Sequence, residues 1–265
     1  MTEIPIYQID AFANRPFAGN PAAVCPLETW LPDETLLAIA AENNLAETAF
    51  FVRQGDRFDL RWFTPAVEVE LCGHATLASG ALVLERMEPS WGKVAFHTRS
   101  GELVVKRAEG GLWSLDLPAR PPVPTIVTGD LVEALGARPT YALQARDLVA
   151  VFDDAEMVRR LKPNMDRIAA LPTFAVAITA PGSHADADVD FVSRFFAPAK
   201  GVPEDPVTGS LHCTLVPYWA DRLGRTFLRA RQVSARGGDL ACTLADKRVE
   251  LKGGAVMVLE GKMRF

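Results

Sequence analysis

The sequence has few cysteines and no paired ones. The four are widely spaced over 265 residues, at Cys25, Cys72, Cys213 and Cys242, and no two of them form a C-x-x-C pair. This spacing predicts neither a disulfide framework nor a zinc site. No apolar run approaches the roughly 18 residues of a membrane span, and the N-terminal stretch lacks the features of a signal peptide. We therefore expect a cytoplasmic protein with no membrane partner.

Basic runs are also absent. The chain carries 28 Lys and Arg against 33 Asp and Glu, a net charge of −5 without a basic patch. This balance excludes nucleic acid as an expected partner. With 49% hydrophobic and 23% charged residues, the composition is that of an ordinary globular protein. A chain of this length can bury two separate cores.

Two segments organise the predicted fold. Ala75 to Leu84 is apolar on nearly every side, which predicts an enclosed helix at the core of the first half. Pro118 to Pro124 holds four prolines in seven residues and predicts a stiff connector. We therefore expect halves at 1–118 and 124–265, with the last strand a candidate to return to the first half.

An internal repeat relates the two halves. Arg61-Trp-Phe-Thr-Pro65 recurs 133 positions later as Arg194-Phe-Phe-Ala-Pro198, and Gly73 recurs 136 positions later as Gly209. The second copy is thus three residues longer, and we assign the extra residues to the stretch around Glu204-Asp205. The repeat predicts a duplicated α+β unit with one apolar helix in each half.

The two glycines predict two equivalent helix starts. Unpaired N–H groups at a helix N-terminus bind anions, so Gly73 and Gly209 are expected to line a shared cleft that holds a carboxylate. Pockets between domains point to the same location. Alternatively, both are simple tight-turn glycines.

One pattern resembles a calcium loop. Asp186-Ala-Asp-Val-Asp190 imitates the opening of an EF-hand, but Phe191 and Ala197 stand where glycine and a bidentate glutamate are required. The stretch instead predicts a strand with Val189 and Phe191 facing inward.

A hydrolase triad is also disfavoured. Ser210, His74 and Asp205 supply the residue types, but Thr208-Gly-Ser-Leu-His212 lacks the second glycine of a nucleophile elbow. At Ser210 the hydroxyl and N–H are better suited to bind a substrate carboxylate.

Four separated motifs carry a family resemblance. They are Phe17-Ala-Gly-Asn-Pro21, Asn44-Leu-Ala-Glu-Thr48, Leu71-Cys-Gly-His-Ala-Thr76 and Glu204-Asp-Pro-Val-Thr-Gly-Ser210. Together they resemble the PhzF family of isomerases over essentially the whole chain. The resemblance implies the diaminopimelate-epimerase-like fold, α+β with two pseudo-symmetric halves, each a sheet wrapped around a central apolar helix. It also implies a homodimer without metal or organic cofactor.

The resemblance also assigns residues. Glu47 matches the family's catalytic glutamate, which takes a proton from an activated carbon and returns one elsewhere. Burial in the apolar strand Ala46 to Phe51 would raise its pKa, which suits a base that also acts as an acid. The expected catalytic residues are Glu47, His74 and Asp205, and the expected substrate-binding residues are Asn20, Gly73, Gly209 and Ser210.

Each of these residues also has an ordinary structural interpretation. Glu47 fits the solvent face of an alternating strand, His74 a hydrogen-bonded structural histidine, and Asp205 a turn. Cys72 lies where the similar two-thiol epimerases carry a catalytic cysteine, and we place its partner position at Pro206. One thiol cannot epimerise with two bases unless Glu47 supplies the second, so Cys72 is predicted to be a small buried hydrophobe.

The sequence therefore predicts a cofactor-independent isomerase that moves a proton on a small carboxylate. An epimerase or lyase acting on a related acid, or a non-catalytic small-acid binding protein, remains an alternative. The segment Gln232 to Gly238 and Cys72 differ from what the resemblance leads us to expect of the phenazine enzymes, which leaves the substrate unassigned.

Overall fold

The computed structural model describes residues 1–265, in which strands outnumber helices. The chain forms two units, Met1–Asp116 with Lys252–Phe265, and Leu117–Leu251. None of the helices is long and apolar enough to span a bilayer.

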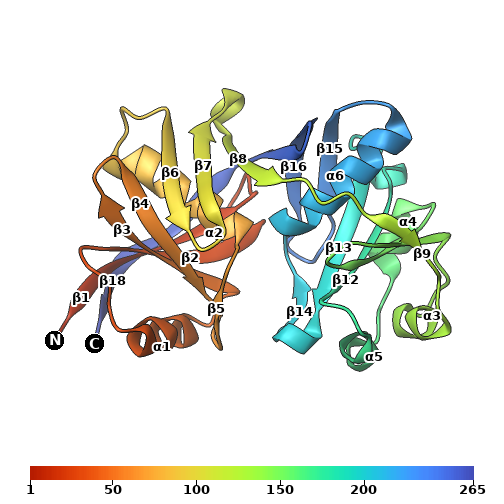
Figure 1. Ribbon diagram of the computed structural model, residues 1–265, viewed down its shortest axis with the longest axis horizontal. Helices are drawn as coiled ribbons and strands as arrows, with labels where there is room; N and C mark the ends of the chain where they lie inside the picture. The colour runs from red at the N-terminus through yellow and green to blue at the C-terminus, as the bar shows by residue number, and fades with distance from the viewer. The chain divides into compact units, whose positions relative to one another are not determined.

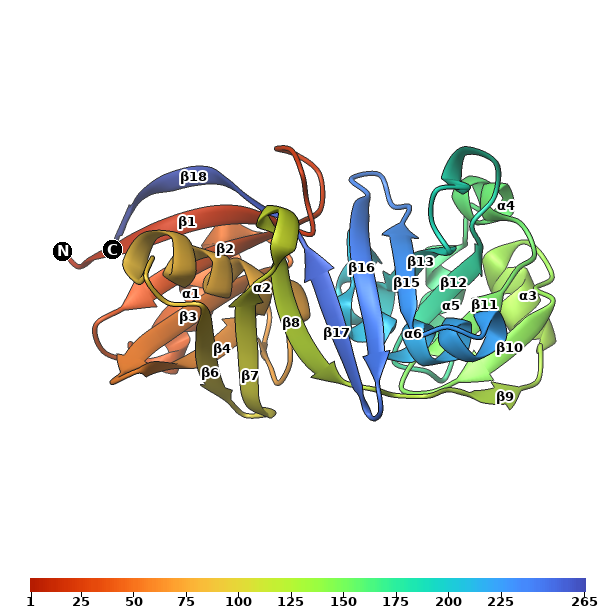
Figure 2. The same ribbon diagram turned by 90° about the horizontal axis from the view of Figure 1, so that it is seen from above.

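The first unit is a sheet wrapped around one helix. Its strands pair in the order β18, β1, β2, β3, β4, β6, β7, β8, with only the β2–β3 and β4–β6 pairs parallel. The strands are β1 (Glu3–Ala11), β2 (Asn20–Leu27), β3 (Glu47–Gln54), β4 (Arg57–Phe63), β5 (Glu68–Val69), β6 (Lys93–Thr98), β7 (Gly101–Arg107), β8 (Trp113–Pro118) and β18 (Ala255–Arg264). Figures 1 and 2 show β18 beside β1, with the two chain ends adjacent. Helix α1 (Asp33–Asn43) connects β2 to β3.

Helix α2 (Gly73–Leu82) fills the centre of this unit and is continued by a π-helical turn, Val83–Met87. All ten of its residues are buried. Gly80 allows the helix to approach the sheet, because a Cβ there would lie 2.4 Å from the Cβ of Val105 in β7. The enclosed helix predicted at 75–84 is confirmed, with its start two residues earlier.

The second unit repeats this plan around a longer helix. Its strands are β9 (Val123–Thr125), β10 (Tyr141–Gln144), β11 (Leu148–Val151), β12 (Val176–Pro181), β13 (Phe191–Ala197), β14 (Val202–Asp205), β15 (Phe227–Gln232) and β16 (Gly238–Ala245), and β17 (Arg248–Gly253) follows. Its helices are α3 (Gly129–Leu135), α4 (Ala155–Arg160), α5 (Met165–Ala170) and the central α6 (Gly209–Leu223). Helix α6 packs against β15 and β16.

The predicted internal repeat is confirmed by the pairing pattern. In the first unit β1–β2 is antiparallel, β2–β3 parallel, β3–β4 antiparallel and β4–β6 parallel. In the second unit β10–β11, β11–β12, β12–β13 and β13–β15 follow the same series. The two halves therefore have the same topology.

An ion pair is repeated with the strands. Arg61 Nε donates to Glu68 Oε1 at 2.8 Å, and Arg194 Nε donates to Glu204 Oε1 at 2.7 Å. Each arginine also uses Nη2 on the second carboxylate oxygen, which makes both pairs bidentate. Such forks fix geometry as well as charge. In each unit the fork ties the end of one strand to the short strand that precedes the central helix.

This pairing corrects the predicted position of the three extra residues. Glu204 is the counterpart of Glu68, so the insertion cannot lie at Glu204-Asp205. It lies instead in the 3₁₀ turn Pro198–Lys200 and Gly201, whose φ of 81° ends the turn. Asp205 still has no acidic counterpart, because Val69 holds the matching place.

The strand predicted over 186–190 is wrong. Residues His184–Asp186 form a 3₁₀ turn, and β13 begins only at Phe191. Phe191 is fully buried as expected, while Val189 is half-buried. The prediction from periodicity failed because the aspartates of the segment pair with arginines elsewhere in the chain.

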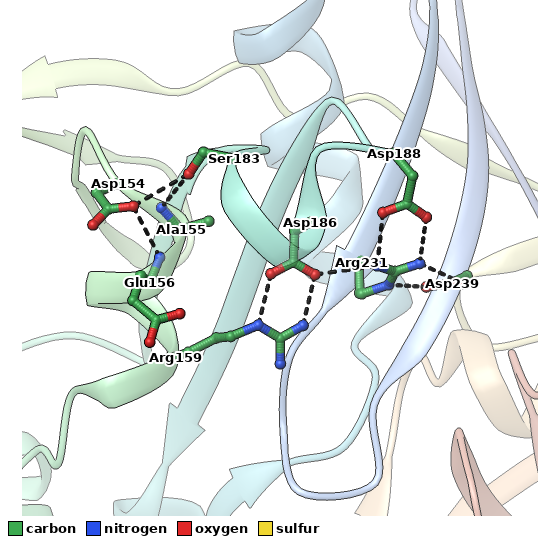
Figure 3. Close-up of polar contacts among 9 residues, drawn as sticks. All are labelled: Asp154, Ala155, Glu156, Arg159, Ser183, Asp186, Asp188, Arg231 and Asp239. Carbon is green, nitrogen blue, oxygen red and sulfur yellow. Dashed lines mark hydrogen bonds and ion pairs between the residues drawn. The ribbon is translucent and has the colours of Figure 1, made fainter.

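Figure 3 shows these ion pairs. Asp186 is 1% exposed and receives two bonds of 2.6 Å from Arg159. Arg231 contacts Asp186 at 3.1 Å and also binds Asp188 and Asp239. Arg159 and Arg231 hold the pKa of Asp186 below its usual range, and the hydrogen bonds from Arg159 are the largest cause. The carboxylates thus clamp the loop to α4 and β15.

Candidate functional site

Three strand and helix starts in the first unit bring the predicted residues together. Asn20 is the first residue of β2, Glu47 the first of β3, and His74 the second of α2. The parallel pairing of β2 with β3 sets Ala22 opposite Glu47, so both strands begin at the same edge of the sheet. Helix α2 begins at Gly73 and packs against both strands.

His74 is the centre of this cluster. Its Nε2 lies 3.3 Å from Glu47 Oε2, and its Nδ1 lies 3.2 Å from Asn20 Nδ2 and 3.5 Å from Cys72 Sγ. The side chains of His74 and Glu47 are 5% and 17% exposed. Glu47 therefore contacts a buried imidazole, which its interpretation as a solvent-facing strand residue did not anticipate.

The imidazole is neutral near pH 7. Burial lowers the pKa of His74 to about 3. A neutral ring carries one proton, and the Asn20 amide N–H donates to Nδ1, so the ring proton belongs on Nε2. Nε2–H therefore faces the Glu47 carboxylate. The group beside Glu47 is a hydrogen-bond donor that adds no full charge.

The cluster also has to be tested as a metal site. Glu47, Cys72 and His74 offer a carboxylate, a thiol and an imidazole within 4.8 Å of one another. However, Glu47 meets Nε2 of the ring and Cys72 meets Nδ1. A single ion can be bound by only one nitrogen of the ring, and the other ligands would then have to lie on that side of the ring. The contacts fit a chain of hydrogen-bonding groups better than a metal centre.

The Phe17-Ala-Gly-Asn-Pro21 motif positions Asn20 through an unusual turn. Phe17 has a φ of 69°, and its N–H donates to Oδ2 of the fully buried Asp10 at 2.8 Å. Gly19 has a φ of 64°, and a Cβ there would lie 2.2 Å from the backbone oxygen of Ala11. Only glycine fits this position. The glycine of this motif is therefore required by sterics, and the turn that it allows places the Asn20 side chain next to His74.

In the second unit the predicted residues gather at the start of α6. Asp205 ends β14, and Thr208 is the N-cap of the helix that opens at Gly209. The Thr208 hydroxyl does not cap the helix but donates to Asp205 Oδ2. Gln232 fastens the loop, because its Oε1 accepts from Thr208 N–H at 2.9 Å and its Nε2 donates to the Asp205 carbonyl at 2.7 Å.

Sequence reasoning missed Gln232 and Arg146. Gln232 is fully buried at the end of β15. Arg146 lies between β10 and β11 and donates from Nη2 to Ser210 Oγ at 3.1 Å. The segment from Gln232 had stood out only as a departure from the expected family pattern, and Arg146 belongs to no motif. A charged Arg-Asp pair between two apolar strands is the one signal that could have found Arg146.

The repeat also corrects the partner of Cys72. Cys72 is the N-cap of α2 and Thr208 the N-cap of α6. The counterpart of the thiol is therefore Thr208, not Pro206. Neither side chain caps its helix: Cys72 contacts the imidazole, and Thr208 contacts a carboxylate. A second thiol is absent from the equivalent position.

The predicted residues thus form two clusters. Asn20, Glu47, Gly73 and His74 meet in the first unit, and Asp205, Gly209 and Ser210 lie around the start of α6 in the second. Helix starts at both predicted glycines are confirmed.

The chain resembles known proteins along its entire length. Residues 9–261 match the family model described as phenazine biosynthesis-like protein. An uncharacterized isomerase of Pseudomonas aeruginosa is 48% identical over 263 residues, covering 99% of this chain and 100% of the relative. The human phenazine biosynthesis-like domain-containing protein is 40% identical, with 98% and 99% of the two chains covered.

Solved structures show the same architecture. A PhzF family protein from Enterococcus faecalis superposes with a TM-score of 0.95 at 42% identity, with each chain covered completely. A probable proline racemase from Agrobacterium radiobacter has a TM-score of 0.63 at 12% identity, covering 99% of this chain and 92% of its own, a likeness of fold alone. With residues 9–261 matched by the family model and 99% of the chain matched by a relative at 48% identity, the chain belongs to the phenazine biosynthesis-like, or PhzF, family.

Proposed function

We propose that the protein is a cofactor-independent isomerase that moves a proton on a small carboxylate by acid–base catalysis at Glu47. Relatives at 41–48% identity carry the name isomerase, which supports the reaction class. The contact between Glu47 and the neutral, buried His74 carries the proposal. It places the Glu47 carboxylate beside a hydrogen-bond donor that has no positive charge to offset the negative charge of the carboxylate.

The proton transfers balance with Glu47 as the group that removes and returns the proton. The carboxylate takes a proton from an activated carbon and becomes a carboxylic acid, and the electron pair of the broken C–H bond is delocalised into the substrate. The carboxylic acid exchanges its proton with solvent, and the same carboxyl group then delivers a proton to another carbon and is restored as a carboxylate. The Nε2–H of His74 stays in place and hydrogen-bonds the carboxylate or the substrate, which stabilises charge during the reaction.

The second cluster carries hydrogen-bond donors that suit an acid group. Backbone N–H groups at the first turn of α6 and the Ser210 hydroxyl are donors, and helix N-termini favour negative charge. Asp205 would orient the substrate and help to carry protons, as expected from the family resemblance. Its carboxylate already accepts the Thr208 hydroxyl, which fixes the position of one of its oxygens.

Product analysis tests the reaction class. Small carboxylic acids with an activated C–H bond would be incubated with the protein in D₂O and followed by NMR spectroscopy and mass spectrometry. We expect a product isomeric with its substrate that carries deuterium at the carbon receiving the proton. Cleavage into two compounds would instead identify a lyase, and the absence of any product with all acids that bind would favour a binding protein.

An epimerase is the second candidate, and Cys72 is the observation that favours it. The thiol contacts His74 on the ring nitrogen opposite to the one that faces Glu47. A thiol and a carboxylate could then serve as two bases. Conversion of one stereoisomer to the other, lost in both Cys72→Ser and Glu47→Gln, would support this alternative over the isomerase.

A further inference from the structure

Arg146 is held as a rigid fork at the start of α6. Its Nε and Nη2 donate to the two oxygens of Asp147 at 2.9 and 2.8 Å, and Asp147 is 1% exposed. The guanidinium carbon lies 4.5 Å from the centroid of the Phe174 ring, so a cation–π contact supports its flat face. A buried carboxylate and an aromatic ring thus fix the orientation of this arginine.

The contact with Ser210 determines which way the serine hydroxyl donates. A guanidinium can only donate hydrogen bonds, so Ser210 Oγ is the acceptor in its 3.1 Å contact with Nη2. The hydroxyl proton of Ser210 is therefore directed to another group. Nη1 of Arg146 carries two further N–H groups that none of these bonds uses.

Backbone donors lie at the same place. The hydrogen bond from His212 N–H to the Thr208 carbonyl opens α6, so the N–H groups of Gly209, Ser210 and Leu211 precede the bonded part of the helix. Thr208, the N-cap, turns its hydroxyl to Asp205 and leaves these groups uncapped. Arginine, hydroxyl and amide donors therefore meet at one helix start.

Arginine charges act on α6, and the carboxylates of Asp147 and Asp205 also lie beside its start. Burial raises the pKa of the Cys213 thiol in α6 to about 12, and the charges of Arg120, Arg146 and Arg248 act in the opposite direction. The positive charges of these three arginines are therefore close enough to α6 to favour the negatively charged form of a group in that helix.

We propose that Arg146 is a substrate-binding residue that, together with Ser210, selects a carboxylate over its neutral amide. This inference rests on the proposed function and adds to it the residue that recognises the acid group. Asp147 would act as a positioning residue, because it occupies one edge of the guanidinium and leaves Nη1 for the ligand. Nη1 can donate to one oxygen of a ligand carboxylate, and the Ser210 hydroxyl can donate to the other.

The test compares acids with their amides. Acetate, benzoate and cyclohexanecarboxylate, each paired with its amide, would be titrated into ¹⁵N-labelled protein, with the Gly209 and Ser210 amide resonances as the readout. At least one acid is expected to bind more tightly than its amide. In Arg146→Gln the affinity for the acid should fall roughly 10- to 100-fold, the range for a lost charge-assisted contact, while that for the amide stays nearly constant.

Two further variants separate recognition from folding. Arg146→Gln leaves Asp147 buried without its partner, so the double variant Arg146→Gln/Asp147→Asn is needed to remove both charges. We expect it to fold and still to lack the preference for acids. Arg146→Lys, which keeps the charge but not the fork, should retain part of the preference. Arg160→Gln, at a side chain 77% exposed in the same unit, is the matched control and should bind like the parent.

Two outcomes would overturn the proposal. One is a double variant that prefers acid over amide as strongly as the parent does. The other is a parent protein that binds no acid of the panel more tightly than its amide. Neither depends on turnover, so failure here can be told apart from failure of the isomerase assignment, which is decided by the product analysis.

Discussion

The buried histidine of α6 should make the protein lose stability in mild acid. His212 is fully buried, its Nδ1–H donates to the Thr208 carbonyl at 2.8 Å, and its ring centroid lies 5.9 Å from that of Phe191. Burial lowers its pKa from 6.5 to about 4, and the hydrogen bond to Thr208 only partly opposes that shift. The folded protein therefore resists protonation that the unfolded chain accepts.

The sign and size follow from linkage. Because the folded pKa is depressed, the stability contributed by neutral His212 is complete above pH 6.5 and is lost as the pH falls toward 4. Between pH 7 and pH 5 this one residue should lower the free energy of unfolding by about 2 kcal/mol. His74, buried in the first unit, should act in the same direction.

The measurement is urea unfolding of the parent and of His212→Asn across this pH range. An asparagine amide can replace the Nδ1–H bond to Thr208 but does not titrate, so the decline between pH 7 and pH 5 should be smaller by about 2 kcal/mol. His97→Asn, at an exposed position, should follow the parent curve. An unchanged slope in His212→Asn would show that the imidazole is protonated in the folded protein and would refute the reasoning.

Two further variants test the scaffold. Asp186→Asn should lower the free energy of unfolding by about 1–3 kcal/mol in urea titrations, because it removes the charge-assisted bonds from Arg159, while Arg231 keeps Asp188 and Asp239; unchanged stability would contradict this. Gly19→Ala should lower the free energy of unfolding by about 1–3 kcal/mol or more in the same measurement. Alanine is strained at a φ of 64°, and its Cβ would also clash with the backbone oxygen of Ala11, so unchanged stability would contradict the prediction.

The repeat was the part of the fold that the sequence predicted best. Local likeness between Arg61–Pro65 and Arg194–Pro198 reflects the same ion pair and the same strand end in both units. The position of the insertion could not be predicted, because only the pairing partners show that Glu204 matches Glu68. Alignment of short motifs therefore predicted the duplication but not where the three extra residues of the second copy lie.

The candidate site was predicted unevenly for a physical reason. Gly19 marks a backbone position that only glycine can occupy, and Gly73 and Gly209 mark the helix starts that the internal repeat aligns, so all three could be located from the sequence. Arg146 reaches Ser210 across 64 positions, and such a contact leaves no local pattern. The aspartates at 186–190 gave a local pattern that wrongly predicted a strand, because their ion-pair partners lie elsewhere in the chain.

Solvent-deuterium incorporation by Glu47→Gln tests the central claim most directly. The parent, the variant and the exposed control Glu42→Gln would be incubated in D₂O with an acid that the parent converts, and deuterium at the reacting carbons would be counted by mass spectrometry. We expect the parent and Glu42→Gln to incorporate deuterium at the same rate, and Glu47→Gln to bind the acid but incorporate none. Undiminished incorporation by a folded Glu47→Gln protein would remove Glu47 from the mechanism.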